Sequence, residues 1–241
     1  MNQLASEITI EKNLPTFSQG VKDCVPTLIG YISIGIAMGI VGAASNLSIL
    51  EVALLSVLVY AGAAQFIICA LLVSGSPFSV IVFTTFIVNL RHFLLCMTLA
   101  PSFKNYSLLK NIGIGTLVTD ESFGVAANKI AKREMINASW MNGLNLTAYI
   151  FWILSCTLGA IFGKWISNPE VLGLDFSLTA MFLALLVLQV ESMERGKLKF
   201  YLSLIAYVIL SMLVLCMFVP SYIAILLSTI IVATIGVVKD K

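Results

Sequence analysis

An arginine and the only histidine of this chain lie within a strongly apolar segment, "FIVNLRHFLL" (residues 86–95). On a helix, Asn89 and His92 share one face, and Arg91 points about 100° away from His92. A charged side chain in an apolar interior is costly unless it meets an opposite charge or a wet cavity. A neutral imidazole can take up and release a proton near neutral pH. These residue types predict a shielded polar site that pairs charges and handles protons.

The anionic partner is expected among two adjacent acids, Asp120 and Glu121, in "VTDESFG". Asp120 shares a helix face with Gly124 and other small residues, along which a backbone or a ligand can approach closely. Glu121 faces apolar residues, where an unpaired carboxylate tends to hold a proton. Our hypothesis is that Arg91 pairs with one acid and that the other acid, or His92, handles protons. An ion pair that only joins two helices remains the alternative.

A second motif, "VYAGAAQF", places Gly62 among alanines one turn before Gln65. Glycine and alanine permit close helix packing or local unwinding, and transporters commonly bind substrate beside helix breaks. Gln65 is therefore a candidate for substrate binding, and a tight helix contact with Gln65 as a hydrogen-bonding group is the alternative. We assign Gly35 and Gly39, in the preceding apolar segment, to helix packing.

The composition predicts the elements that must position these residues. Of 241 residues, 59% are hydrophobic and 11% are charged, with a mean hydropathy of +1.02, whereas soluble domains carry about 25% charged residues. The predicted fold is all-α, a polytopic transmembrane helical bundle with about eight spans of roughly 20 residues each. These spans are residues 24–44, 51–73, 78–100, 111–128, 137–163, 176–194, 200–219 and 221–238.

The distribution of basic residues predicts the orientation. With eight complete crossings, ten lysines and arginines fall on the side of the two termini and three on the other side, so both termini are expected to be cytoplasmic. We predict a cytoplasmic tail over residues 1–23, one transporter domain over 24–238 and a short cytoplasmic tail over 239–241. Whether spans two and four are complete crossings or re-entrant segments stays open.

Several functional classes are disfavoured by the sequence. The net charge of +2, without a basic and aromatic stripe, argues against a nucleic-acid partner. One histidine and no ligand cluster argue against a metal site, and no cofactor is expected. An intramembrane hydrolase using His92, Asp120 and Ser122 is a weak alternative, because Ser122 lacks a G-x-S-x-G setting. We therefore expect no enzyme; a gated channel and a passive structural subunit remain rivals to a transporter.

The motifs "VYAGAAQF", "IVNLRHFLL" and "TDESFG", in this order, resemble the pattern of the AzlC family, the large subunit of bacterial branched-chain amino acid exporters. The resemblance runs over nearly all of residues 20–240. It implies a multi-pass protein of the bacterial cytoplasmic membrane that exports leucine, isoleucine, valine and, in some members, methionine, driven by the proton gradient. It also implies a small hydrophobic AzlD-type partner subunit.

A zwitterionic substrate gives the charged residues compatible roles. Arg91 could take the carboxylate of the amino acid, and Asp120 or Glu121 could take its ammonium group, while aliphatic and aromatic residues surround the branched side chain. The substrate would then compete with an internal ion pair, and protonation of the acid would release that pair.

Overall fold

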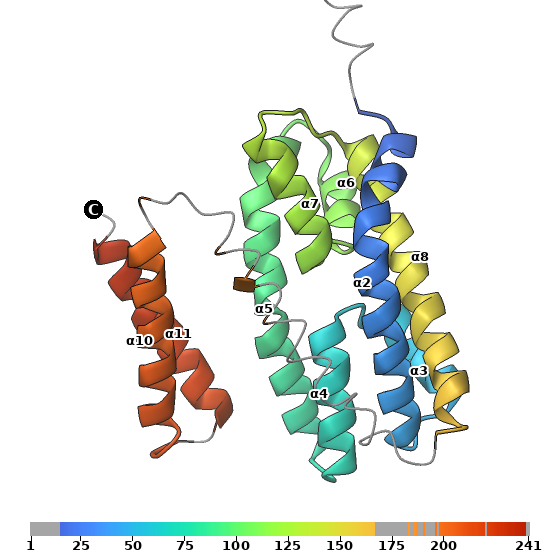
Figure 1. The fold of residues 1–241 in the computed structure, drawn as a ribbon, viewed down its shortest axis with the longest axis vertical. Coiled ribbons are helices and arrows are strands. Elements are labelled where there is room, and N and C mark those ends of the chain that lie inside the picture. Colours follow the sequence, from blue (N-terminus) through green and yellow to red (C-terminus); the bar gives the residue numbers. More distant parts are fainter. Residues whose placement is uncertain are drawn as a thin grey trace, which may run out of the picture. The chain divides into compact units, whose positions relative to one another are not determined.

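The computed structural model describes residues 15–166, 198–219 and 221–239, with a few single positions between 183 and 196. Within these ranges every regular element is a helix, as the sequence predicts (Figure 1). The chain forms two compact units, Met1–Thr179 and Ala180–Lys241. The first unit contains α2 (Phe17–Ala44), α3 (Ile49–Leu58), α4 (Gly62–Val73), α5 (Phe78–Phe103), α6 (Leu108–Gly115), α7 (Asp120–Ala131) and α8 (Ala138–Gly163). The second contains α10 (Leu198–Leu215) and α11 (Ser221–Lys239).

Helices α2 and α8 form a closely packed parallel pair. Small residues allow this contact: a Cβ atom on Gly20 would lie 2.0 Å from the carbonyl oxygen of Trp140, and one on Gly39 would lie 2.0 Å from that of Cys156. Gly35 lies at the same interface. Gly20 meets Trp140 and, further along, Gly39 meets Cys156. Because the residue numbers in α2 and α8 increase together along the contact, the two helices run in the same direction. The backbones therefore approach more closely than any larger side chain would allow.

The segment predicted as the second span is a re-entrant helix pair. Helices α3 and α4 are separated by Val59–Ala61, and the side-chain Nε2 of Gln65 lies 3.3 Å from the hydroxyl of Ser56. A continuous helix would hold these residues about 13 Å apart along its axis, so the chain turns back. Each half is about 15–18 Å long, too short for a hydrocarbon core of about 30 Å. For residues 51–73 the structure therefore favours the re-entrant alternative that the sequence left open.

The predicted fourth span, residues 111–128, also turns back in its middle. Helix α6 follows α8 in the same direction, because Tyr106 contacts Ala138 at its start and the Ile114 carbonyl accepts from Asn145 at its end. Helix α6 ends at Gly115. Residues 116–118 separate it from Thr119, the N-cap of α7.

Helix α7 returns along α2 in the opposite direction. Glu121 at its start contacts Tyr31, and Lys129 near its end contacts Asp23. Figure 1 shows α3 and α4 in one half of the first unit and α6 and α7 in the other half. The two helix pairs therefore enter the first unit from opposite ends, and their turning points lie near its middle.

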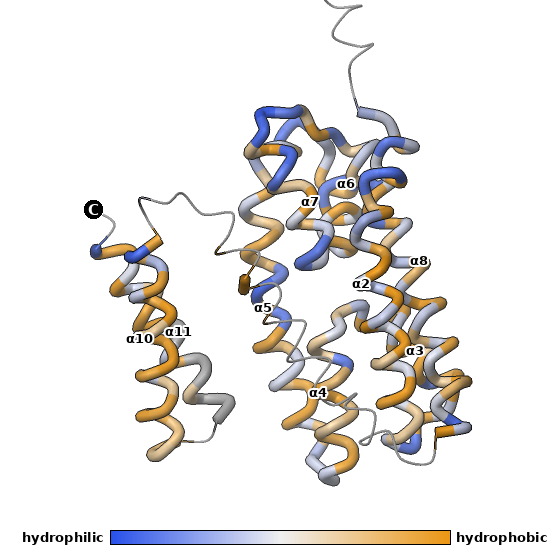
Figure 2. The backbone as a smooth tube through the Cα atoms, viewed as in Figure 1, coloured by the Kyte–Doolittle hydropathy of each residue, from blue (hydrophilic) through white to orange (hydrophobic). Residues whose placement is uncertain are grey.

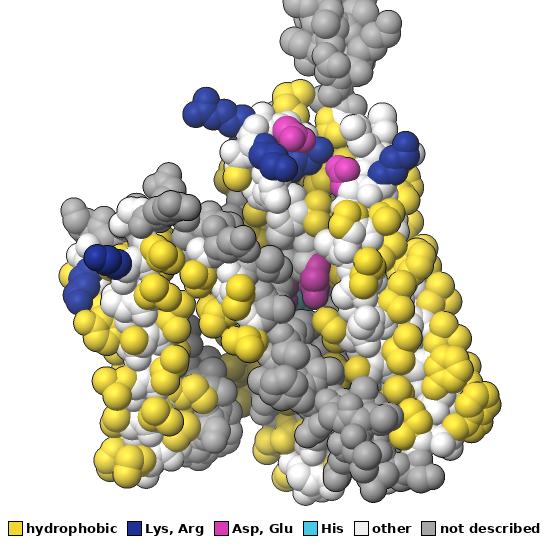
Figure 3. All heavy atoms as spheres, viewed as in Figure 1, with side chains coloured by type: hydrophobic (Ala, Val, Ile, Leu, Met, Phe, Trp, Pro, Cys, Tyr) yellow, Lys and Arg dark blue, Asp and Glu magenta, His cyan; other side chains and the backbone are white. Residues whose placement is uncertain are grey.

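Hydropathy and charge agree with this arrangement. Figure 2 shows hydrophobic stretches along the helices and hydrophilic residues mainly at their ends, and Figure 3 shows most of the charged side chains of the first unit gathered at one end. Among the residues that the structure describes, four helices are long and apolar enough to cross a membrane: α2, α5, α8 and α10. The chain is therefore a helical membrane protein.

Each re-entrant pair returns the chain to the side from which it entered. The loops at residues 74–77 and 104–107 therefore lie on the side opposite to the one that eight complete crossings would give. Lys104 and Lys110 were expected on the outer side, but α5 ends and α6 begins at the same end of the first unit as Lys22 and Lys129. Of the described residues outside the middle of this unit, six basic side chains lie at that end. They are Lys22, Lys104, Lys110, Lys129, Lys132 and Arg133.

At the opposite end of the first unit, Lys164 follows α8. This sharper asymmetry supports a cytoplasmic location for the end at which α2 begins. The positions of both termini and the total number of spans stay predictions, and the predicted span 176–194 falls outside the described ranges. The single transmembrane domain over 24–238 is likewise a prediction.

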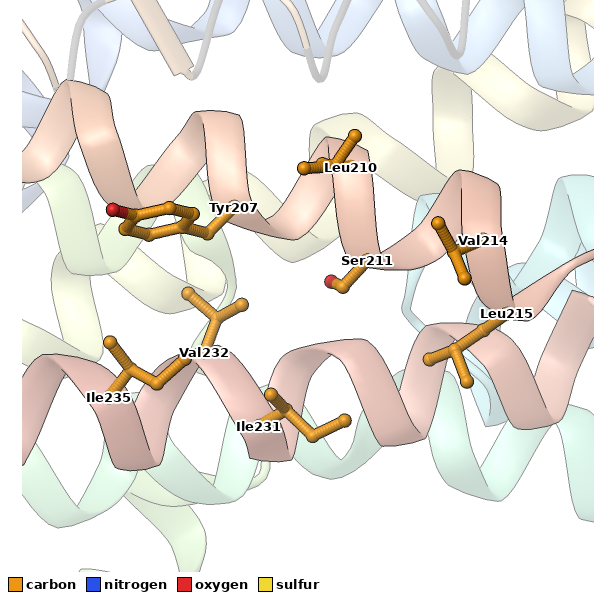
Figure 4. Close-up of a pocket in the computed structure, with 8 residues that line it drawn as sticks. All are labelled: Tyr207, Leu210, Ser211, Val214, Leu215, Ile231, Val232 and Ile235. Atoms are coloured by element: carbon orange, nitrogen blue, oxygen red, sulfur yellow. The ribbon is translucent and has the colours of Figure 1, made fainter.

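The second unit is a hairpin of α10 and α11 with an apolar pocket of about 360 Å³ between the helices (Figure 4). The hydroxyl of Ser211, one of its two polar lining residues, donates to the Val208 carbonyl in its own helix. The pocket is lined by Tyr207, Leu210, Ser211, Val214, Leu215, Ile231, Val232 and Ile235. Because no charged side chain lines it, the pocket offers nothing to the charged ends of an amino acid.

Candidate functional site

Tyr31, in the middle of α2, reaches the turning point between α6 and α7. Its hydroxyl is hydrogen-bonded to the Thr119 hydroxyl and donates to Glu121 Oε2 at 3.1 Å. Thr119 caps α7, because its side chain accepts from the Ser122 amide. The Ser122 hydroxyl in turn accepts from the Thr119 amide at 2.9 Å. Ser122 is thus buried and is part of the cap of α7.

The other turning point is bound to α8. Trp152 Nε1 donates to Gln65 Oε1 at 3.0 Å, and Gln65 donates to Ser56 in α3. A Cβ atom on Gly62 would lie 2.9 Å from the Trp152 ring, so glycine brings the start of α4 directly against this indole. The Tyr31 ring packs edge-on against Trp152, with centroids 5.6 Å apart. Tyr31 and Trp152 therefore connect the two re-entrant pairs.

The expected ion pair forms between α5 and α7. The Arg91 guanidinium lies 3.0 Å from Asp120 Oδ2, and the two side chains are 25% and 21% exposed. Asp120 and Glu121 are both in the first turn of α7, where the helix dipole favours negative charge. They point to different neighbours, Asp120 to α5 and Glu121 to Tyr31 in α2. Of the two candidate partners, the structure pairs Arg91 with Asp120.

The remaining candidates on α5 lie beside this pair. His92 is half-buried and interacts electrostatically with Arg91 and Asp120. The Asn89 side-chain oxygen is buried and has no hydrogen-bond partner among the described residues. Within the same residues, open space rather than a packed helix lies next to Gly124. The structure thus gathers Arg91, His92 and Asp120, whereas Gln65 belongs to the neighbouring network around Trp152.

A second charged cluster holds the C-terminal end of α7 in place. Lys129 Nζ lies 2.9 Å from Glu134 and 3.3 Å from Asp23, which also accepts from Trp140 Nε1 at 2.8 Å. The pKa of Lys129 is raised mainly by its hydrogen bond to Glu134. Its contacts with Asp23 raise this pKa further. Asp23 is in α2 and Trp140 in α8, so this cluster holds α7 to both long helices.

The sequence analysis missed three members of the central site: Tyr31, Tyr60 and Thr119. A signal for Thr119 was present, because a threonine followed three residues later by a polar side chain is typical of a helix N-terminus. Tyr60 stands in a motif that was examined for its glycine and glutamine. Tyr31 gives no local signal, since its partners lie 88 and 90 positions away in the sequence.

Comparison with known proteins places these features in a family. The sequence matches the AzlC protein family over residues 26–166, a range that contains both re-entrant pairs and the ion pair. The chain belongs to the AzlC family. The resemblance seen in the three motifs is thereby confirmed, and AzlC proteins include a transport protein, so the chain has a membrane transport role.

Individual relatives agree with this assignment. The chain is 30% identical over 181 residues to the inner membrane protein YgaZ of Escherichia coli strain K12, which covers 71% of this chain and 72% of YgaZ. It is 25% identical over 167 residues to the branched-chain amino acid transport protein AzlC of Bacillus subtilis strain 168, covering 68% and 64% of the two chains. A membrane protein of Haemophilus influenzae is 31% identical over 185 residues, covering 72% and 69%. No solved structure matches this chain.

Proposed function

We propose that this AzlC-family protein exports branched-chain amino acids across the bacterial cytoplasmic membrane in exchange for protons. The observation that carries the proposal is the meeting of two re-entrant helix pairs around Tyr31, beside Glu121 and the Arg91–Asp120 ion pair. Transporters commonly bind substrate at interrupted helices near the middle of the bilayer. The name of the Bacillus subtilis relative supports the substrate class.

Glu121 is the group that we assign to coupling. Its carboxylate lies at the turning point of α6 and α7 and is bonded to Tyr31, whereas the neighbouring Asp120 is already paired with Arg91. One carboxylate binds either a proton or the ammonium group of an amino acid, but not both. Competition at this single group converts a proton gradient into movement of the amino acid in the opposite direction.

The Arg91–Asp120 pair acts as the switch between conformations. The pair joins α5 to the first turn of α7, so its rupture frees the tip of the re-entrant pair. A proton taken up by Asp120 or His92 weakens the attraction. Arg91 is engaged in the structure, so a substrate carboxylate binds there only by breaking an existing ion pair.

A small hydrophobic AzlD-type subunit belongs to the same proposal, supported by the family resemblance. The test reconstitutes the purified protein in liposomes, with and without that subunit, and follows labelled leucine. An exchanger accumulates leucine only when a pH gradient is imposed. Equilibration without accumulation would indicate a gated channel, and absence of movement with both subunits present would exclude the proposed transport.

A further inference from the structure

Helix α4 begins near the middle of the first unit without a side-chain cap. Its N-cap residue is Ala61, with φ −151° and ψ 97°, and no side chain accepts a hydrogen bond there. The first backbone bond of this helix runs from the Gln65 amide to the Ala61 carbonyl at 3.0 Å. The preceding amides, those of Gly62 to Ala64, have no acceptor within a helix. Such a terminus attracts an anion through its amides and its dipole.

Tyr60, directly before this terminus, supplies an independent observation. It immediately precedes the cap, is 8% exposed, and its hydroxyl has no hydrogen-bond partner among the described residues. The ring packs edge-on against Tyr149, with centroids 4.8 Å apart. The hydroxyl lies near the Tyr31 and Thr119 hydroxyls, outside hydrogen-bond geometry with either, and near Glu121. A buried hydroxyl without a partner costs folding free energy, and native proteins seldom keep one without a function.

An acid lies near the Tyr60 hydroxyl. Glu121, at the turning point of the other re-entrant pair, is hydrogen-bonded to Tyr31, and Tyr31 and Tyr60 both border the same polar cluster. Donors that favour a carboxylate therefore lie next to a carboxylate that favours a cation. A zwitterionic α-amino acid offers both charges on neighbouring atoms, which matches this arrangement.

We propose that the first-turn amides of α4 and the Tyr60 hydroxyl bind the α-carboxylate of the amino acid, while Glu121 binds its ammonium group. The inference rests on the proposed function for the class of substrate. It assigns the carboxylate to the turn between α3 and α4 and leaves Arg91 in its pair with Asp120. Ala61 and Tyr31 are buried in the structure, so the site is closed here and opens when the re-entrant pairs separate.

The first test compares ligands with and without a carboxylate. The purified full-length protein, with its small subunit, is titrated with L-leucine and with L-leucinamide. Tyr60→Phe keeps the ring and removes the hydroxyl. We expect the Kd for leucine to rise about tenfold, because a hydrogen bond to a charged group is lost, and the Kd for leucinamide to stay within about twofold.

Tyr106→Phe is the matched control. Its hydroxyl accepts from the Ala138 amide at the cytoplasmic end of the unit, so its loss should leave the leucine affinity unchanged. Equal affinities of the Tyr60→Phe variant and the parent for leucine would overturn the inference. The same holds if Arg91→Gln, and not Tyr60→Phe, removes the preference for leucine over leucinamide.

A second variant fills the proposed site from within. Ala61→Asp places a carboxylate at the N-cap of α4, where it satisfies the free amides. We expect leucine binding to fall more than tenfold while the Tm stays at or above that of the parent. The neutral variant Ala61→Asn should weaken binding less. Parental leucine affinity in a folded Ala61→Asp protein would contradict the inference.

The outcomes separate this inference from the proposed function. If the parent protein neither binds nor transports leucine, the proposed function fails and the site falls with it. If the parent transports leucine, but Tyr60→Phe and Ala61→Asp bind it like the parent, the transport function stands and the carboxylate site is wrong.

Discussion

At the scale of single residues, the charges of the central site divide between two structural roles. Asp120 and Glu121 are neighbours in sequence, but consecutive positions on a helix point about 100° apart, so one reaches Arg91 in α5 and the other reaches Tyr31 in α2. The ion pair fixes α7 to α5. The second acid, Glu121, lies at the turning point and is hydrogen-bonded to Tyr31.

The ion pair can be tested by a double-mutant cycle. Arg91→Gln and Asp120→Asn each leave a half-buried charge without its main partner, so each is expected to lower the free energy of unfolding by about 1–3 kcal/mol. The double variant should lose less than the sum, because it leaves no uncompensated charge. Thermal unfolding of the three purified variants measures this. Strictly additive losses would show that the two side chains do not stabilise each other.

Glu121 predicts a direction for the pH dependence of binding. As the pH falls, protonation of a carboxylate that binds the ammonium group displaces the substrate, so the Kd for leucine should rise. Glu121→Gln removes the competing site, and we expect weaker binding that no longer varies with pH. Leucine titrations of both proteins between pH 5 and 8, roughly the range in which proton coupling operates, provide the measurement. Parental pH dependence in the variant would assign the proton to another group.

At the scale of elements, the site depends on the tight parallel contact of α2 and α8. This contact holds Tyr31 against Trp152, and through them the turning points of both re-entrant pairs. The small residues at the interface let the backbones approach, which is what brings side chains from distant elements together. The glycines are therefore as necessary to the site as the polar residues.

Two glycines of α2 offer a matched comparison. A Cβ atom at Gly39 meets the backbone of α8 at 2.0 Å, whereas one at Gly30 meets nothing within 4 Å. We expect Gly39→Ala to destabilise the protein by about 1–3 kcal/mol or more, because the backbones must separate. Gly30→Ala should be neutral or stabilise slightly, by up to about 1 kcal/mol. Equal Tm values for the two variants would contradict the close packing of α2 and α8.

At the scale of the whole molecule, the sequence allowed the class of the protein and one ion pair to be predicted, but not the topology. The composition alone is sufficient to predict a helical membrane protein. The charged motifs predicted an ion pair, which the structure contains between Arg91 and Asp120. Hydropathy does not distinguish a complete span from two apolar halves that turn back, because both expose a similar stretch of apolar residues. At the turning points, Gly62 packs against the Trp152 ring at the start of α4, and Thr119 and Ser122 form the cap of α7.

Long-range contacts explain the rest of what was missed. The hydrogen bond between Tyr31 and Glu121 joins residues 90 positions apart, and that between Gln65 and Trp152 joins residues 87 apart. Neither pairing leaves a periodic pattern in the sequence. The orientation of two loops was also reversed, because each re-entrant pair returns the chain to the side from which it entered.

The most direct test of the account measures proton movement during leucine transport. Liposomes containing the protein and its small subunit are loaded with a pH-sensitive dye and given a leucine gradient without an initial pH gradient. The account predicts that leucine movement drives protons in the opposite direction, and that Glu121→Gln abolishes this proton flux. Leucine movement without proton flux in the parent, or an undiminished proton flux in the variant, would contradict it.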